Sequence, residues 1–248
     1  MLRLLCVTAH PDDEAGGFGG TLLHYARRGV ETHVLCLTPG QAATNRGGAK
    51  SDDELATLRR KEFAASCKIL NVSHGEVLDY PDGRLYRMDF YTVVEDLTRR
   101  MRTIRPHLVI TMGPEGSITT HPDHSMVSLF ATMAFHWGSR SNRFPEQLKQ
   151  GLEAHEAQKL YYTSAILTLP DRQPVLLPPV TATIEASEFL EAKIAAFKAH
   201  TTQAPLFARV EDTIRKRGGK EYFHLAAAAT PRNAEQETDL FAGIMEQE

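Results

Sequence analysis

A histidine and three carboxylates stand together near the start of the chain, in the run Ala9-His10-Pro11-Asp12-Asp13-Glu14. They follow an apolar segment, 4–9, that predicts a buried strand. A second cluster of the same chemistry, His121-Pro122-Asp123-His124, occurs much later in the chain. Charged groups are seldom buried without a partner, and open α/β sheets bind ligands at the carboxyl ends of their strands. The two clusters therefore predict one metal site, assembled by folding at such an edge.

The residue types in both clusters are zinc ligands. Zinc binds imidazole nitrogen and carboxylate oxygen, and a catalytic site keeps one position open for water. His10 and Asp13 lie three residues apart, as do His121 and His124, which lets both side chains of a pair face one point at the start of a helix. Either cluster alone is equally compatible with a helix cap. If three side chains of the two clusters bind the metal, two candidates for other roles remain. One of these could act in acid–base chemistry, and the other could support a ligand.

Strands and helices alternate along the part of the chain that carries these clusters. We expect strands at 4–9, 32–38, 76–80 and 107–112, and helices at 14–28, 51–70, 89–104 and 122–137. Ser51 and Glu54 have the spacing of a capping box. This alternation predicts an α/β fold, with a mostly parallel sheet and helices on both faces.

The rest of the chain continues with predicted strands at 159–169, 180–184 and 221–227 and helices at 187–200 and 205–217. Residues 139–156 are polar and irregular, which predicts an insertion near the site. The sequence contains no repeat, low-complexity segment or clear linker. We therefore expect residues 1–248 to form a single domain.

The composition restricts the class of protein. With 42% hydrophobic and 24% charged residues it is typical of a globular protein, and the net charge of −3 argues against a nucleic-acid partner. No apolar run approaches the roughly 20 residues of a membrane span. Cys6, Cys36 and Cys67 are widely spaced, which indicates reduced thiols. Because the N-terminus also lacks a signal-peptide pattern, we expect a cytoplasmic protein.

The motifs Ala-His-Pro-Asp-Asp-Glu and His-Pro-Asp-His together resemble those of the PIG-L/LmbE-like family of zinc N-deacetylases. This family includes N-acetylglucosaminyl-phosphatidylinositol deacetylases and the deacetylases and amidases of mycothiol and bacillithiol metabolism. The resemblance extends to residues 38–41, 59–62 and 80–83 and to the stretch from Lys193 to Gln203. It implies a Rossmann-like fold and one bound zinc ion. Many relatives assemble, so a homo-oligomer is also expected.

The resemblance implies roles for single residues. The implied zinc ligands are His10, Asp13 and His124. Asp12 would be the general base that takes a proton from the attacking water. His121 would stabilise, and help to protonate, the tetrahedral intermediate. Asp123 would hold a neighbouring imidazole in its productive tautomer.

Other residues have two interpretations each. Arg59 matches a family position thought to face the substrate, and an exposed helix arginine is the alternative. Asp82 lies in a predicted turn, where its carboxylate would bond sugar hydroxyls or only stabilise the turn. Glu14 is assigned to a helix cap or to support of the ligands. His200 would reach the site or complement a helix dipole.

The chain also departs from the family. Residues 117–120, Ser-Ile-Thr-Thr, stand where many members have a glycine-rich or tyrosine-bearing loop, so no tyrosine at that position can donate to an oxyanion. Gln41 stands where many members have an acid. The glycines between Gly16 and Gly20 lack the third glycine of a dinucleotide motif, and we interpret them as places of close helix–sheet packing.

We predict a zinc-dependent hydrolase that removes an acetyl group from the amide nitrogen of an N-acetylglucosamine-type sugar or conjugate. One alternative is a zinc amidase for a non-sugar or thiol-conjugate amide. The other is a Rossmann-like binding module without hydrolysis. The combination of a complete ligand set with Asp12 favours the hydrolase, because a binding module needs no carboxylate beside the metal.

Overall fold

The computed structural model describes residues 1–166, 176–230 and 236–246. Its centre is a seven-stranded sheet with the order β3-β2-β1-β4-β5-β7-β6. The first five strands along the chain pair in parallel: β1 (Arg3–Thr8), β2 (Glu31–Cys36), β3 (His74–Val77), β4 (Leu108–Thr111) and β5 (Lys159–Ser164). β7 (Lys220–Ala228) pairs antiparallel with β5 and with β6 (Ala182–Glu185). The predicted mostly parallel α/β sheet is confirmed.

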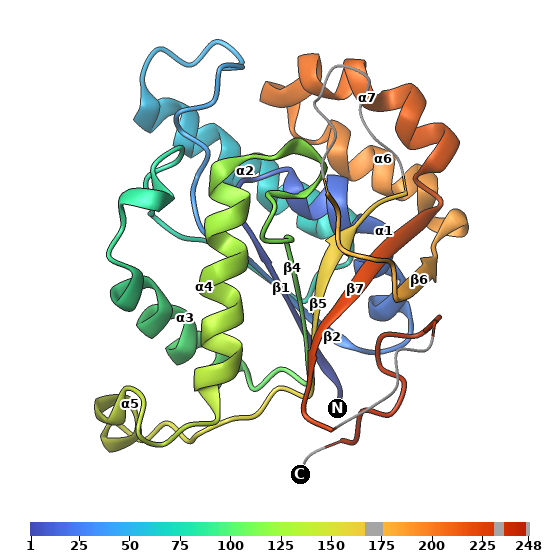
Figure 1. Cartoon of the computed structure of the whole chain (residues 1–248). Coiled ribbons are helices and arrows are strands. Elements are labelled where there is room, and N and C mark those ends of the chain that lie inside the picture. Colours follow the sequence, from blue (N-terminus) through green and yellow to red (C-terminus); the bar gives the residue numbers. More distant parts are fainter. Residues whose placement is uncertain (167–175, 231–235, 247–248) are drawn as a thin grey trace.

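Helices cover both faces of the sheet, as predicted (Figure 1). One face carries α1 (Asp13–Arg27), α2 (Asp52–Ile69), α6 (Leu190–Lys198) and α7 (Ala204–Arg217). The other carries α3 (Phe90–Ile104) and α4 (Pro122–Gly138). Each layer buries its own hydrophobic core against the sheet, for example Phe18 and Phe63 on the first face and Leu97 and Phe130 on the second.

The strand order places the two chemical clusters side by side. β2 and β3 lie on one side of β1, and β4 lies on the other side. The chain therefore changes direction across the sheet between β1 and β4, and open α/β sheets bind ligands at such a switch point. The first cluster follows β1 directly. The second follows β4 through a loop and a short 3-10 turn, Ser117–Thr119.

Most predicted elements are confirmed within a few residues. The Ser51 side chain caps α2 by accepting from the Glu54 N–H at 3.1 Å, but the Glu54 carboxylate accepts from Lys50 N–H instead of closing the capping box. β3 begins earlier than predicted, and the predicted helix at 187–200 starts as a 3-10 turn, Ser187–Phe189. The predicted strand at 159–169 ends at Ser164, and its part beyond residue 166 lies outside the described residues.

The expectation that 139–156 forms an insertion near the site is wrong. This segment contains a short helix, α5 (Pro145–Lys149), and lies at the end of α4 that is remote from the clusters (Figure 1). Buried Arg102 of α3 organises it. The guanidinium donates to Gln147 Oε1 and to the backbone carbonyls of Trp137, Gly138, Arg140, Arg143 and Phe144.

Replacing Arg102 should therefore destabilise the fold without changing the chemistry. We expect Arg102→Met to lower the free energy of unfolding by about 3 kcal/mol, because it leaves several buried carbonyls without a donor. Urea denaturation measures this loss. The control Arg99→Met loses one hydrogen bond, to Gln150, and should cost less than about 1 kcal/mol. Equal losses in the two variants would contradict an organising role for Arg102.

All three cysteines are buried and free. Among the described residues, no helix is both long enough and apolar enough to cross a membrane.

Candidate active site

Asp13, the first residue of α1, lies between two imidazoles. Its Oδ2 accepts from the backbone N–H groups of Ala9 and His10, at 3.2 and 2.8 Å, and lies 3.5 Å from His10 Nδ1. Its Oδ1 lies 3.2 Å from Nε2 of His124 in α4. One carboxylate thus connects the two clusters that the sequence separates.

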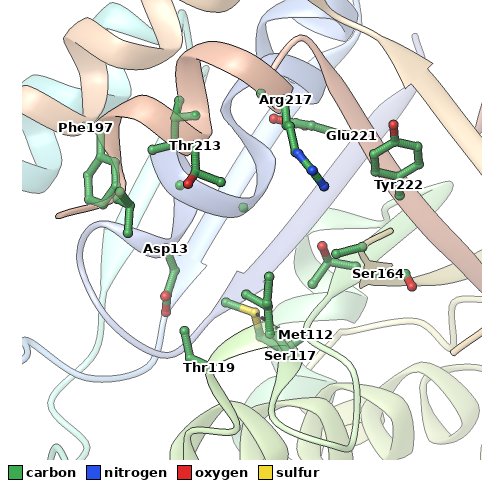
Figure 2. A pocket seen from close by; sticks show the side chains of 18 of the residues that line it. Asp13, Met112, Ser117, Thr119, Ser164, Phe197, Thr213, Arg217, Glu221 and Tyr222 are labelled. Atoms are coloured by element: carbon green, nitrogen blue, oxygen red, sulfur yellow. Dashed lines mark hydrogen bonds between the residues drawn. The ribbon is translucent and has the colours of Figure 1, made fainter. Parts of the chain in front are cut away.

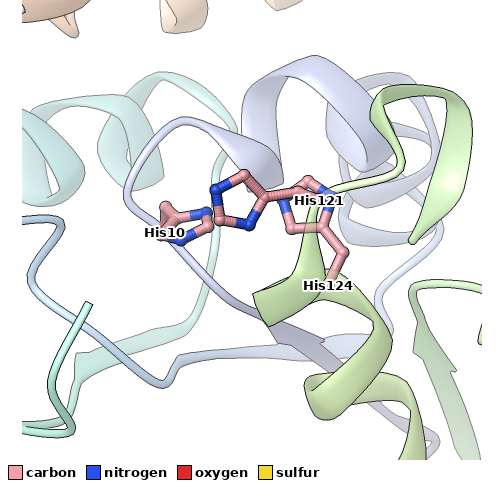
Figure 3. A group of neighbouring side chains, drawn as sticks. All are labelled: His10, His121 and His124. Carbon is pink, nitrogen blue, oxygen red and sulfur yellow. The ribbon is translucent and has the colours of Figure 1, made fainter. Parts of the chain in front are cut away.

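His121 completes a group of three imidazoles at this edge of the sheet (Figure 3). The ring centroid of His10 lies 4.7 Å from that of His121 and 5.3 Å from that of His124. The three side chains can bring one nitrogen each within 4.8 Å of one another. His121 therefore belongs to one group of three possible ligands, and Asp13 lies beside the two other members of this group.

Two further carboxylates approach His10 from the opposite side. Nε2 of His10 lies 3.0 Å from Asp82 Oδ1 and 3.5 Å from Asp123 Oδ2. Asp123 is fully buried and accepts from the backbone N–H groups of Gly83 and Leu85, at 2.6 and 3.2 Å. Asp82 accepts from Ala42 N–H at 2.9 Å. These bonds tie Asp123, in the first turn of α4, to the loop after β3, and they tie Asp82 to the loop after β2.

The electrostatics of the cluster follow from this crowding. Burial acts against a charged His10, but the neighbouring carboxylates of Asp123, Asp13 and Asp82 raise the pKa of its imidazole well above the ordinary value. Burial also opposes a charged Asp13, yet the neighbouring His124 and His10 hold the pKa of its carboxyl well below the ordinary range. Burial and the two other imidazoles lower the pKa of His121, which favours its neutral form.

The donor set fits a divalent metal ion. Ligand atoms about 2.0–2.1 Å from a tetrahedral zinc lie roughly 3.3 Å from one another. Asp13 Oδ1 lies 3.2 Å from His124 Nε2, and the other oxygen, Oδ2, lies 3.5 Å from His10 Nδ1, so each oxygen of this carboxylate has one imidazole at a separation close to this value. His10 Nε2 is buried without a well-directed hydrogen bond, although Asp82 is near it.

Neighbouring groups orient the rings of His124 and His121. Thr119 Oγ1 lies 3.2 Å from Nδ1 of His124, so that Nε2 faces Asp13. In His121, Nδ1 accepts from Asp123 N–H at 3.2 Å and caps α4. A neutral His121 therefore carries its proton on Nε2, where it is a hydrogen-bond donor.

Asp12 is held in a strained backbone conformation beside these groups. Its φ of 126° is rare for a residue with a side chain. Such conformations persist where the surroundings hold them, commonly in active sites. Here the backbone N–H donates to Glu14 Oε2 at 2.9 Å, and Oδ2 accepts from Arg59 Nη2 at 3.1 Å. Burial raises the pKa of Asp12 to about 6, against the lowering effect of Arg59.

Arg59 and Asp82, the predicted substrate contacts, both reach the site but bond to the protein. Arg59 is 2% exposed and donates to the carbonyls of Gly40 and Pro11 in addition to Asp12. Gly40 makes this approach possible, because a Cβ there would lie 2.0 Å from Nη1 of Arg59. Asp82 is 8% exposed and contacts His10 and Ala42. This geometry favours positioning roles for both residues.

Glu14 organises a buried polar layer beneath Asp12. Its Oε1 accepts from Ser66 Oγ and from His200 Nε2, both at 2.6 Å, while Oε2 accepts from the Asp12 N–H. Of its two sequence interpretations, the geometry favours support of the site. His200 likewise reaches the site through Glu14. Ser66 was not predicted as a site residue. The one sign of it in the sequence was a serine on the apolar face of a predicted helix.

A second buried carboxylate ties the C-terminal part to the site. Glu62 of α2 accepts from Thr201 Oγ1, and from both the N–H and the Oγ1 of Thr202, at 2.6–2.8 Å. Gln203 donates to the Asn45 carbonyl at 3.2 Å. The 200–203 segment thus holds α2 and the loop after β2 in place.

Comparison with known proteins agrees with this arrangement. A family model named PIG-L and described as GlcNAc-PI de-N-acetylase matches residues 5–135, which include both clusters. A Catenulispora acidiphila protein named 1D-myo-inositol 2-acetamido-2-deoxy-alpha-D-glucopyranoside deacetylase 2 is 28% identical, over 97% of each chain. Diacetylchitobiose deacetylase of Thermococcus kodakarensis is 30% identical over 82% of this chain and 70% of its own.

The solved structures show the same fold. N,N'-diacetylchitobiose deacetylase from Pyrococcus horikoshii superposes with a TM-score of 0.77 over 90% of this chain and 83% of its own, at 24% identity. The fold, the two clusters and the family match point to one assignment: the chain belongs to the PIG-L family of de-N-acetylases.

Proposed function

We propose that this chain is a zinc-dependent deacetylase that hydrolyses the amide of an N-acetylglucosamine unit carrying a substituent. The observation that carries the proposal is the juxtaposition of the carboxylates of Asp12 and Asp13 with three imidazoles at the switch point of the sheet. The names of the relatives, which are deacetylases of N-acetylglucosamine-type sugars, support this substrate class. We further propose that residues 1–248 act as one domain.

We propose His10, Asp13 and His124 as the metal ligands. When bound, zinc supplies a Lewis acid that lowers the pKa of water to about 7 and polarises a carbonyl. Asp123 and Asp82 would hold the His10 ring from the other side, and such partners orient metal-binding imidazoles. The Arg59 guanidinium would hold the Asp12 carboxylate in place.

Asp12 is the proposed general base. Its carboxylate takes the proton of the attacking water as the water oxygen forms a bond to the acyl carbon. The C–N bond then breaks as a proton reaches the nitrogen, which gives one acetate and one amine. Asp12 is free for this role because Asp13 already supplies the carboxylate ligand.

His121 is the proposed donor to the oxygen that becomes negative in the tetrahedral intermediate. We expect His121→Asn to lower kcat about 10²–10³-fold, as is typical for the loss of one such donor. Asparagine keeps an oxygen that can cap α4, so the variant tests the imidazole and not the cap. The measurement is kcat together with zinc content. Loss of zinc in this variant would instead make His121 a ligand, in agreement with the group of three imidazoles.

The substrate class is tested by comparing turnover of three sets of compounds. These are N-acetylglucosamine conjugates, chito-oligosaccharides and N-acetyl amino acids, each assayed for released acetate with the zinc-loaded protein. The proposal predicts the highest kcat/KM for N-acetylglucosamine conjugates. If N-acetyl amino acids were clearly the best substrates, the sugar assignment would be lost, and only an amidohydrolase would remain.

A further inference from the structure

A cavity of about 300 Å³ opens next to the catalytic groups (Figure 2). Asp12, Asp13 and His124 line it, and it extends from them beneath α7 toward Arg217 and Tyr222. Its volume lies at the lower end of the range of small-molecule sites, roughly 300–1,000 Å³. The cavity is therefore large enough to hold a part of the substrate beyond the amide.

Most of the wall of this cavity is apolar. Leu206, Val210 and Ile214 recur at intervals of four residues and present one face of α7 to it. Phe197 of α6 and Met112, which follows β4, complete the apolar surface. Apolar groups leave water for such a surface, so the wall selects an apolar ligand.

Lys193 and Glu221, two of the charged groups on the wall, are satisfied by the protein, and Arg217 lies at the far end of the cavity. Lys193 Nζ lies 2.6 Å from Glu221 Oε1, and both side chains are buried. The Glu221 carboxylate also accepts from the backbone N–H groups of Gly20 and Thr21, both at 2.8 Å. An apolar ligand therefore leaves none of these hydrogen bonds broken.

Gly17 of α1 keeps one side of the cavity open. A Cβ at Gly17 would meet no atom within 4 Å, whereas one at Gly20 would lie 2.6 Å from the Cβ of Ala186. Close packing, the interpretation from the sequence, thus explains Gly20 but not Gly17. Glycine within a helix is less stable than alanine. At Gly17 the absence of a side chain instead leaves free space that belongs to the cavity.

We propose that this cavity, the apolar pocket, binds an apolar chain of the substrate while the amide lies at Asp12 and the histidines. This inference rests on the proposed function and specifies its substrate. The chain belongs either to the acyl group that is removed or to the group attached to the sugar. The chemistry of recognition is the same in both cases, and the experiment separates them.

The test uses the zinc-loaded protein and two series of compounds. One series is N-acyl glucosamines from acetyl to octanoyl, and the other is N-acetylglucosamine glycosides from methyl to octyl. Release of the amine is measured in both. We expect kcat/KM to rise by at least about tenfold with chain length in one series, because even one methylene that enters a hydrophobic pocket changes kcat/KM by roughly tenfold or more. The series that shows the rise identifies the source of the chain.

Filling the pocket should abolish this preference. Gly17→Leu and, from a different helix, Val210→Phe are each expected to lower the ratio of kcat/KM for the longest and shortest compounds by about tenfold. The control Ile69→Phe, at an exposed position of α2, should leave the ratio unchanged. The ratio is taken within each variant, so a general loss of activity does not affect it.

The outcomes distinguish the two proposals. A zinc-loaded wild type that hydrolyses none of the compounds contradicts the proposed function. Turnover that is flat or falls with chain length in both series overturns the apolar pocket but keeps the deacetylase. Filled variants that fold and retain the full preference would also overturn the pocket.

Discussion

His10→Ala should remove the metal and the activity together. His10 contacts Asp13, Asp82 and Asp123. Its loss removes one proposed ligand and leaves three carboxylates close together without the imidazole that they share. We expect purified His10→Ala to contain less than about a tenth of the zinc of the wild type, since a metal site depends on its full ligand set. Turnover should fall to background.

Metal analysis by mass spectrometry and the acetate assay on the same sample provide the measurement. The matched control is His136→Ala, which removes an exposed histidine from α4 and should change neither quantity. Full zinc occupancy in His10→Ala would refute the ligand assignment, and the group of His121 and His124 would then need a different third ligand.

Asp12→Asn should separate chemistry from metal binding. Asparagine tolerates the positive φ of this position better than most residues, and its side-chain oxygen can still accept from Arg59. It cannot take a proton from water. We expect zinc content to stay at the level of the wild type and kcat to fall 10²–10⁴-fold, which is the usual contribution of a positioned acid or base.

The control for Asp12→Asn is Asp53→Asn, which replaces an exposed carboxylate in the first turn of α2. It should leave kcat unchanged. An Asp12→Asn variant with near-normal turnover would exclude Asp12 as the base. One that lost its zinc would make Asp12 part of the metal site.

The sequence predicted the parts of the site that follow a strand directly. His10 and Asp13 stand immediately after β1, so the strand alone fixes where they lie. His121 and His124 could be placed because β4 and α4 both have strong apolar patterns. The parallel pairing of β1 with β4 then makes the two clusters neighbours. These inferences need only local periodicity and the rule that ligands gather at the carboxyl edge of a parallel sheet.

The supporting contacts could not be predicted, because they join residues that are far apart in sequence. His200 and Glu14 are separated by 186 positions and form a buried hydrogen bond. The burial of Arg59 depends on Gly40, whose missing side chain leaves room for the guanidinium. Polarity suggested an insertion near the site at 139–156, but the guanidinium of Arg102 draws this segment to the other end of α4. Such pairings depend on tertiary packing, which no local pattern encodes.

Reconstitution with metal tests the central claim most directly. The protein is stripped with a chelator, zinc is added back in steps, and acetate and free amine released from a methyl glycoside of N-acetylglucosamine are both measured. The account predicts that activity is absent without metal and rises linearly to a maximum at one zinc per chain, with acetate and amine formed in equal amounts. Full activity in the metal-free protein, or zinc binding without release of either product, would contradict it.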